Sequence, residues 1–114
     1  MVHIYKIVPQ EMWQAAEAEG IFHGAPVDLA DGYIHFSTAE QAQETAAKHF
    51  QGQTGLLLAA FDSGHFGDDL KWEPSRGGAL FPHLYTSLPV SAALWVKPLP
   101  LGTDGQHEFP EMDQ

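Results

Sequence analysis

The chain has 114 residues, of which 44% are hydrophobic, and this length and composition predict one globular domain with a single core. It contains no cysteine, which excludes disulfide bonds, thiolate metal sites and a cysteine nucleophile. Fifteen acidic residues against five basic ones give a net charge of −10, and such a surface repels nucleic-acid phosphates. We therefore expect no nucleic-acid partner.

The apolar segments of the chain are short. The N-terminus shows no basic region followed by a long apolar run, as a signal peptide would have. The best apolar run, Leu56–Phe61, is strand-sized, whereas a membrane-spanning helix needs roughly 18 residues. We therefore expect a cytoplasmic protein without a membrane partner. We also expect a monomer or a weak homodimer.

The chain begins with a predicted strand and a predicted helix. His3–Val8 alternates in polarity and is rich in β-forming residues, which predicts a strand. Gln10–Glu19 predicts a helix that begins after Pro9 and ends at Gly20. Ile21–Ala30 is expected to be an irregular loop with a short extended piece at its start.

A strand that leads directly into a helix is expected next. Tyr33–Phe36 predicts the strand, and the helix is expected to run to about Phe50. Ser37 and Glu40 have the spacing of a capping box, with Ser37 as the N-cap. This strand–helix unit is the strongest local feature of the sequence.

The second half of the chain is expected to be mostly strands. We expect strand material at Leu56–Phe61, Leu70–Glu73, Leu84–Tyr85 and Ala92–Leu99, with loops at Asp62–Asp69 and Pro74–Leu80. The apolar run Leu56–Phe61 should be buried on both faces. Two early helices followed by strands indicate an α+β domain at residues 1–102, and 103–114 is expected to be a flexible acidic tail.

The first candidate site lies on the predicted strand before the second helix. Alternation places Tyr33 and His35 on one face and Ile34 and Phe36, which suit the core, on the other. His35 lies two residues before the predicted helix N-terminus at Ser37, where free N–H groups bind anions. Two interpretations of His35 stay open: a ligand-binding or acid–base residue, or a half-buried histidine bonded to the backbone.

The second candidate site comes from the C-terminal half. Glu73 stands at a strand end before Pro74, where a carboxylate can have a raised pKa and act as acid or base. His83 and Tyr85 share a strand face and repeat the earlier pairing of histidine with tyrosine. Arg76, the only arginine, could bind a phosphate or carboxylate. The alternatives are a solvated carboxylate and a surface arginine.

The seven histidines do not show metal-site spacing. No His-x-x-x-His or His-Glu-x-x-His pattern occurs, and these are the spacings that place two ligands on one helix face. A site built from His35, His83 and Glu73 is geometrically conceivable, but it is the least favoured alternative. We expect no bound metal.

Three segments together resemble the bacterial family called domain of unknown function 952 (DUF952). They are Asp31–Thr38 (DGYIHFST), Leu70–Glu73 (LKWE) and Phe81–Tyr85 (FPHLY), and the likeness extends over residues 2–100. The family has no established reaction. Its fold looks like that of ADP-ribosyltransferases, which bind NAD in the cleft of a split β-sheet, and the resemblance implies this fold here.

The resemblance to ADP-ribosyltransferases implies roles residue by residue. Those enzymes carry a histidine or arginine on the first strand, where this chain has Tyr5 or Lys6. His35 falls where their nicotinamide-stacking tyrosine lies. Their catalytic glutamate corresponds to a position near His83, and Glu73 is the nearest carboxylate. The catalytic triad is therefore incomplete.

The resemblance implies a small domain that binds NAD or an ADP-ribose-like nucleotide, with NAD as a candidate substrate and no certain cofactor. It could be a divergent ADP-ribosyltransferase or glycohydrolase, and the alternative is a binding module that has lost catalysis. A metal-dependent hydrolase is the weaker alternative. The candidate catalytic residues are Glu73 and His83, and the candidate ligand-binding residues are His35, Tyr33, Ser37, Arg76 and Tyr85.

Overall fold

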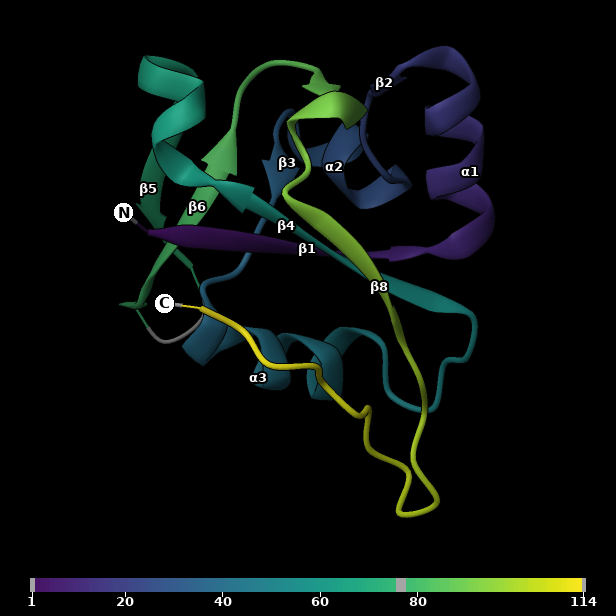
Figure 1. Ribbon diagram of the computed structural model, residues 1–114. Helices are drawn as coiled ribbons and strands as arrows, with labels where there is room; N and C mark the ends of the chain where they lie inside the picture. The colour runs from purple at the N-terminus through teal and green to yellow at the C-terminus, as the bar shows by residue number, and fades with distance from the viewer. Residues whose placement is uncertain (1, 76–77, 114) are drawn as a thin grey trace.

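Two three-stranded antiparallel sheets form the frame of the protein. A computed structural model describes residues 2–75 and 78–113 (Figure 1). The first sheet has the order β1 (His3–Pro9), β4 (Leu56–Asp62) and β8 (Trp95–Leu99). The second has the order β3 (Ile34–His35), β6 (Leu80–Leu84) and β5 (Leu70–Pro74). A short antiparallel pair, β2 (Ile21–Phe22) and β7 (Leu88–Pro89), lies beside the helix α1 (Gln10–Glu19).

A backbone bridge joins the two sheets between β1 and the residues that follow β3. The N–H of Tyr5 donates to the carbonyl of Ser37 at 2.7 Å, and the N–H of Ser37 donates to the carbonyl of Tyr5 at 2.9 Å. The predicted α+β class, a mixture of helices and strands, is confirmed.

The helices pack around these sheets. They are α1 (Gln10–Glu19), α2 (Pro26–Asp31) and α3 (Ala39–His49), with 3-10 turns η1 (Ser63–Asp69) and η3 (Val90–Ala92). The prediction of an irregular loop over Ile21–Ala30 was wrong in its second half, which forms α2. Pro26 favours a helix start because its missing N–H would have no partner in the first turn. Six residues are too few to show helical periodicity.

The loop predictions in the second half also need correction. Asp62–Asp69 was expected to be irregular, yet 63–69 form the 3-10 turns of η1. Strand material was expected only from Leu84, whereas β6 begins at Leu80. Proline cannot donate a hydrogen bond to a neighbouring strand and is normally confined to sheet edges, so Pro82 argues against a strand that the structure nonetheless has. The backbone carbonyl of Pro82 accepts from Phe36 at 3.0 Å.

The cap of α3 lies one residue later than predicted. The hydroxyl of Thr38 accepts from the N–H of Gln41 at 3.3 Å, and the Gln41 side chain accepts from the N–H of Thr38 at 3.0 Å. The predicted capping pair, Ser37 and Glu40, was therefore wrong. Ser37 cannot take the cap position because its backbone still pairs with Tyr5.

Replacing Thr38 with alanine should therefore lower the free energy of unfolding by about 1 kcal/mol, because the cap bond to Gln41 is lost. Glu40→Ala is the matched control, since Glu40 is exposed and only the predicted cap would have used it. Urea unfolding of both variants measures the difference. An equal loss in the two variants would contradict the observed cap.

The core lies on both faces of β4. Phe61 packs with Trp13 of α1 at a ring distance of 6.3 Å, and both side chains are buried. Leu58, on the opposite face of the strand, packs with Tyr5 and with Ala46 of α3. This arrangement confirms that Leu56–Phe61 forms a strand buried on both faces. Burial of such side chains is the main stabilising term for a domain of this size.

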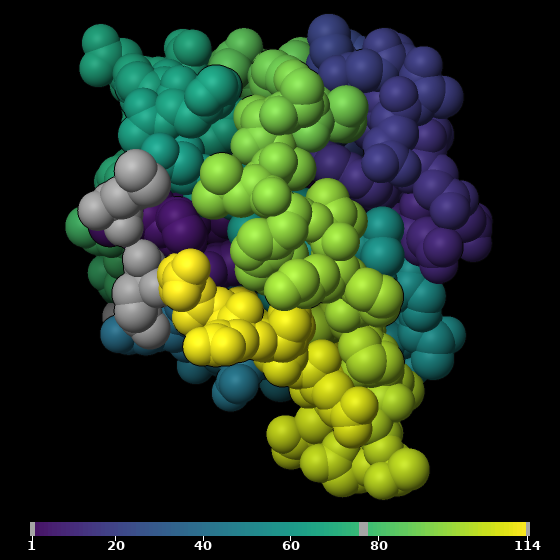
Figure 2. Space-filling view, viewed as in Figure 1, coloured from purple at the N-terminus to yellow at the C-terminus, as the bar shows by residue number. Residues whose placement is uncertain are grey.

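The C-terminal segment lies along the outside of the molecule, beside β8 and α3 (Figures 1 and 2). Phe109 and Met112 pack against the core cluster that contains Leu58. The hydroxyl of Tyr5 donates to the backbone carbonyl of Asp113 at 2.5 Å. Flexibility of 103–114 stays a prediction, but these contacts connect the segment to the core.

The helices of the described residues are short. Among residues 2–75 and 78–113, none is long and apolar enough to cross a membrane.

Candidate functional site

Five predicted site residues lie together on one face of the β3–β6–β5 sheet. We call this surface the aromatic–histidine face, and it consists of Tyr33, His35, Glu73, His83 and Tyr85. The strand register pairs His35 with His83. Because successive side chains of a strand point to opposite faces, their neighbours Ile34 and Leu84 point into the core, where 3% and 0% of their surfaces stay exposed.

Tyr33 lies at the centre of the aromatic–histidine face. Its ring is stacked on His83 with a centroid distance of 4.1 Å and an interplanar angle of 25°. Its centroid lies 4.7 Å from that of His35 and 5.3 Å from that of Tyr85. The two histidine–tyrosine pairs of the sequence therefore lie together, and the four rings form one contiguous group.

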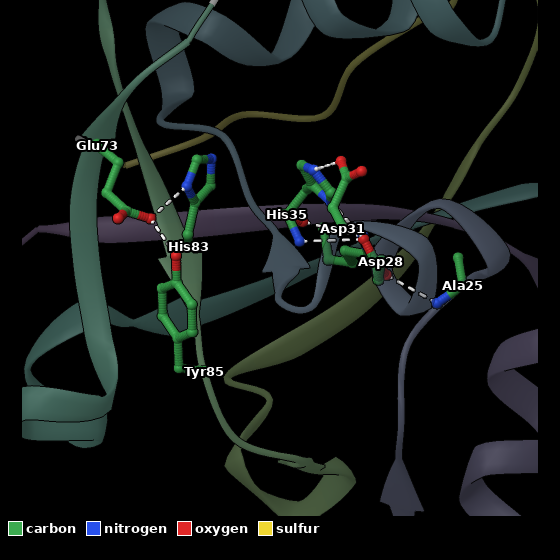
Figure 3. A network of polar contacts seen from close by, with 8 residues as sticks. Ala25, Asp28, Asp31, His35, Glu73, His83 and Tyr85 are labelled. Carbon is green, nitrogen blue, oxygen red and sulfur yellow. Dashed lines mark hydrogen bonds and ion pairs between the residues drawn. The ribbon is translucent and has the colours of Figure 1, made fainter.

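Glu73 connects two of these rings by hydrogen bonds. Its Oε1 accepts from the Tyr85 hydroxyl at 2.7 Å and from Nδ1 of His83 at 2.8 Å (Figure 3). The bond from Tyr85 and the bond from His83 lower the pKa of Glu73. The same bond to Glu73 raises the pKa of Tyr85 to about 12.

This direction corrects the prediction that Glu73 has a raised pKa. The expectation rested on the position of Glu73 at a strand end before Pro74, whereas two hydrogen-bond donors stabilise its ionised form. At neutral pH Glu73 is a carboxylate. It can accept a proton or stabilise positive charge, but it has no proton to donate.

His35 lies between two carboxylates. Its Nδ1 is 2.7 Å from Oδ1 of Asp28, and its Nε2 is 2.9 Å from Oδ2 of Asp31 (Figure 3). Ionised carboxylates only accept hydrogen bonds, so both contacts form together when both ring nitrogens carry hydrogen. This arrangement fixes the orientation of the His35 ring.

Asp28 holds His35 from the inside of the protein. Its side chain is fully enclosed and accepts from Lys6 Nζ at 3.0 and 3.1 Å, from the N–H of Ala25 at 2.7 Å and from the N–H of His35 at 3.1 Å. Lys6 Nζ also donates to the carbonyl of His35 at 2.9 Å. These bonds join β1, α2 and β3 at the edge of the aromatic–histidine face.

The buried pair stays ionised because each charge is satisfied. Burial alone would raise the pKa of Asp28, but the bond from His35 and the charge of Lys6 outweigh it and lower that pKa to about 2. Burial lowers the pKa of Lys6, and the Asp28 carboxylate opposes that shift. A buried charge without such partners would be strongly disfavoured.

Another predicted ligand-binding residue, Ser37, is not brought to this face. Ser37 is buried, with 4% of its surface exposed, and its hydroxyl lies 2.9 Å from that of Thr45 on α3. Arg76 lies outside the described residues. A ligand-binding role for Ser37 therefore has no support from a contact with the face.

A depression of about 270 Å³ opens beside the aromatic–histidine face. It lies between α2 and the loop that joins β6 to β7, and its wall includes Tyr33, Tyr85 and Leu29. A larger hollow of about 460 Å³ is lined by Val2, His65 and Leu94, and it contains none of the predicted site residues. The chemistry of the side chains therefore favours the smaller depression.

Comparison with known proteins identifies the family. A family model described as "Protein of unknown function (DUF952)" matches residues 7–96. The chain belongs to the DUF952 family. This finding agrees with the resemblance of the three motif segments, which together contain all five residues of the aromatic–histidine face.

Solved structures of protein CC0527 from Caulobacter crescentus are similar to this DUF952 chain. The X-ray structure has 55% sequence identity and a TM-score of 0.90, and the match covers 93% of each chain. The solution NMR structure has 56% identity and a TM-score of 0.85, with 93% and 91% of the two chains covered. No curated protein matches this chain.

Sequence reasoning about the DUF952 chain missed Lys6 and Asp28 as parts of the site. Lys6 was considered only as a possible first-strand position, and Asp28 fell in a segment expected to be a loop. A usable signal for Lys6 was a single cation inside an otherwise apolar strand, since such a residue needs a buried partner. No comparable signal marked Asp28.

The described residues of the DUF952 chain contain no cluster of metal ligands that would support a metal-dependent hydrolase. Across residues 2–75 and 78–113, no group of three or more histidine, cysteine, aspartate or glutamate side chains is placed to hold a metal ion. His35 and His83 face each other at a centroid distance of 5.5 Å, but their bonded nitrogens point to different carboxylates.

The DUF952 domain should lose stability in acid through Asp28. Its folded pKa of about 2 lies below the ordinary value of 3.8, so its stabilisation is complete above that value and is lost as the pH falls towards 2. The shift corresponds to about 2 kcal/mol. Urea unfolding at pH 5 and pH 2 should show a smaller acid loss in Asp28→Asn than in the wild type. An equal loss in both proteins would contradict the shift.

Proposed function

We propose that the aromatic–histidine face binds NAD or an ADP-ribose-like nucleotide. The observation that carries this proposal is the stack of Tyr33 on His83, with Tyr85 beside it at the wall of the depression. Aromatic side chains that border a recess stack on flat heterocycles, and each such stack contributes about 1–3 kcal/mol. The proposed ligand therefore carries a nicotinamide or purine ring.

The size of the depression favours one ring-bearing half of such a ligand. Pockets for drug-sized ligands span roughly 300–1,000 Å³, and this depression of about 270 Å³ is slightly smaller. In the proposed pose the ring occupies the depression and the rest of the nucleotide extends across the surface.

The local charge favours the nicotinamide end of NAD. Asp31 and Glu73 lie on either side of the rings. Burial raises the pKa of Tyr33, and the negative charges of Asp31 and Glu73 raise it further. The nicotinamide ring of NAD is cationic, so carboxylates around it are favourable. Lys71 is opposite His83 in the register of β5 and β6 and is exposed, which makes it the described cation best placed for a phosphate.

Catalysis, if the ligand is NAD, would break the bond between ribose and nicotinamide. That step leaves positive charge on the ribose, and the ionised Glu73 would stabilise it. Nicotinamide departs with the bonding electrons, water adds to the ribose carbon, and the proton released goes to a base such as Glu73. The products would be nicotinamide and ADP-ribose, and an acceptor in place of water would make the reaction an ADP-ribosyl transfer.

The two sheets joined at Tyr5 and Ser37 support the proposed relation to ADP-ribosyltransferases. The hydrogen bonds of Glu73 argue against catalysis, because its Oε1 already accepts from Tyr85 and His83. That observation favours the second candidate function, a binding module that keeps the recess without the reaction.

Calorimetric titration with NAD and with ADP-ribose tests the binding proposal, and chromatography of released nicotinamide tests catalysis. We expect saturable binding of NAD, and Glu73→Gln should abolish nicotinamide release if the domain is a glycohydrolase. Binding without release would favour the binding module. The absence of binding for both nucleotides would end the proposal.

A further inference from the structure

A second group of reactive side chains borders the same depression. Ser87, in the loop between β6 and β7, has its Oγ 3.3 Å from Nδ1 of His23. Nε2 of His23 is 2.7 Å from Oε1 of Glu19. His23 and Ser87 both line the depression, and neither belongs to the aromatic–histidine face.

The fold brings these three residues together by its backbone register. The pairing of β2 with β7 sets Phe22 opposite Leu88, and continuing that register by one residue sets His23 opposite Ser87. Gly20 ends α1 with a φ of 89°, a left-handed conformation that glycine adopts without strain, and the chain then turns so that Glu19 reaches His23. The carboxylate thus comes from a helix end and the other two groups from paired segments.

We propose that Ser87, His23 and Glu19 form a nucleophilic triad that cleaves small carboxylic esters. The three roles are a hydroxyl nucleophile, a base within hydrogen-bond reach and a carboxylate that orients the base. Ser87 uses Nδ1 and Glu19 uses Nε2, and the ring can serve in this order because either nitrogen of a neutral imidazole can accept while the other donates. The distance of 3.3 Å fits the looser contacts common in unliganded sites.

The chemistry of this triad is balanced without any cofactor. His23 takes the proton of the Ser87 hydroxyl as its oxygen attacks the ester carbon, and the alcohol leaves with that proton. Water then attacks the acyl group on Ser87, His23 again takes a proton and returns it to the serine oxygen, and a carboxylic acid is released. The backbone N–H groups of Thr86 and Ser87 make no hydrogen bond to the described residues, so they are candidate donors to the developing oxyanion.

The wall of the depression indicates the substrate class. Tyr33, Tyr85 and Leu29 line it together with the hydroxyls of Thr86 and Ser87. A flat ring would lie against the tyrosines while the ester group meets Ser87. The triad therefore suits an aryl ester with a small acyl group, and this inference does not depend on nucleotide binding.

A fluorophosphonate probe tests the nucleophile directly, because it forms a covalent adduct with an activated serine. Intact mass and peptide mapping should place one adduct on Ser87, and Ser87→Ala should remove it. Ser91→Ala is the matched control, since Ser91 is exposed and lies outside the triad. A correctly folded wild type that takes no adduct, or an adduct on another residue, would overturn the proposal.

Hydrolysis of 4-nitrophenyl acetate tests the base. We expect His23→Ala to lower kcat/KM by about 100-fold or more, within the range that general-base groups contribute. His65→Ala should leave the rate unchanged, since His65 is exposed and lines the other hollow. Equal rates in the wild type, His23→Ala and Ser87→Ala would show that surface imidazoles act without a triad and would overturn the inference.

Discussion

Replacing Asp28 with alanine is expected to lower the free energy of unfolding by about 3–5 kcal/mol, as is typical when one partner of a buried ion pair is removed. Lys6 would remain buried, with 5% of its surface exposed, and would lose two of its three acceptor contacts. The N–H groups of Ala25 and His35 would also lose their acceptor. Urea unfolding monitored by tryptophan fluorescence and circular dichroism measures the loss.

Two further variants show whether the loss comes from the buried charge. Asp31→Ala removes the other carboxylate bonded to His35, but Asp31 is exposed, so its loss should be no more than about 1 kcal/mol. The double variant Lys6→Met with Asp28→Leu should be more stable than Asp28→Ala, because no unpaired charge stays buried. A cost for Asp28→Ala as small as that for Asp31→Ala would mean that the Lys6–Asp28 pair does not stabilise the fold.

Tyr33→Ala should weaken NAD binding by about 5- to 150-fold, which corresponds to the loss of one ring stack. The tyrosine contributes its ring to the centre of the aromatic–histidine face, and alanine leaves His83 and Tyr85 without that partner. Tyr33→Phe should bind within a few-fold of the wild type, because it keeps the ring. Calorimetric titration of the three proteins measures these affinities.

Trp72→Ala is the control for a general loss of aromatic surface. Trp72 is 40% exposed and belongs to β5, but its side chain points to the opposite face of the strand from Glu73. Its removal should leave NAD affinity unchanged. A similar weakening in Trp72→Ala and Tyr33→Ala would place the ligand elsewhere or make its binding nonspecific.

The composition of the aromatic–histidine face could be predicted because strand alternation is a local property. Ile34 identified the core side of its strand, and Tyr33 and His35 necessarily took the other side. His83 and Tyr85 followed in the same way. The two histidine–tyrosine pairs meet because of the register of β3 with β6. A single sequence suggests that register only through the repetition of histidine and tyrosine on both strands.

The support beneath the face could not be predicted because it depends on tertiary contacts. Asp28 and Lys6 are separated by 22 residues, and nothing local to α2 requires a carboxylate there. The helix-capping role expected for Ser37 was wrong because it, too, depends on a tertiary contact. Its backbone pairs with Tyr5, and this contact moves the helix cap to Thr38.

The central claim is that the aromatic–histidine face is the ligand site, and NMR titration with NAD tests it most directly. In ¹⁵N-labelled protein, increasing NAD should shift the amide signals of Tyr33, His35 and Tyr85 in a saturable manner, and Tyr33→Ala should reduce those shifts. Signals near Val2 and His65, at the larger hollow, should stay in place. Shifts confined to that hollow, or no shifts at millimolar NAD, would contradict the claim.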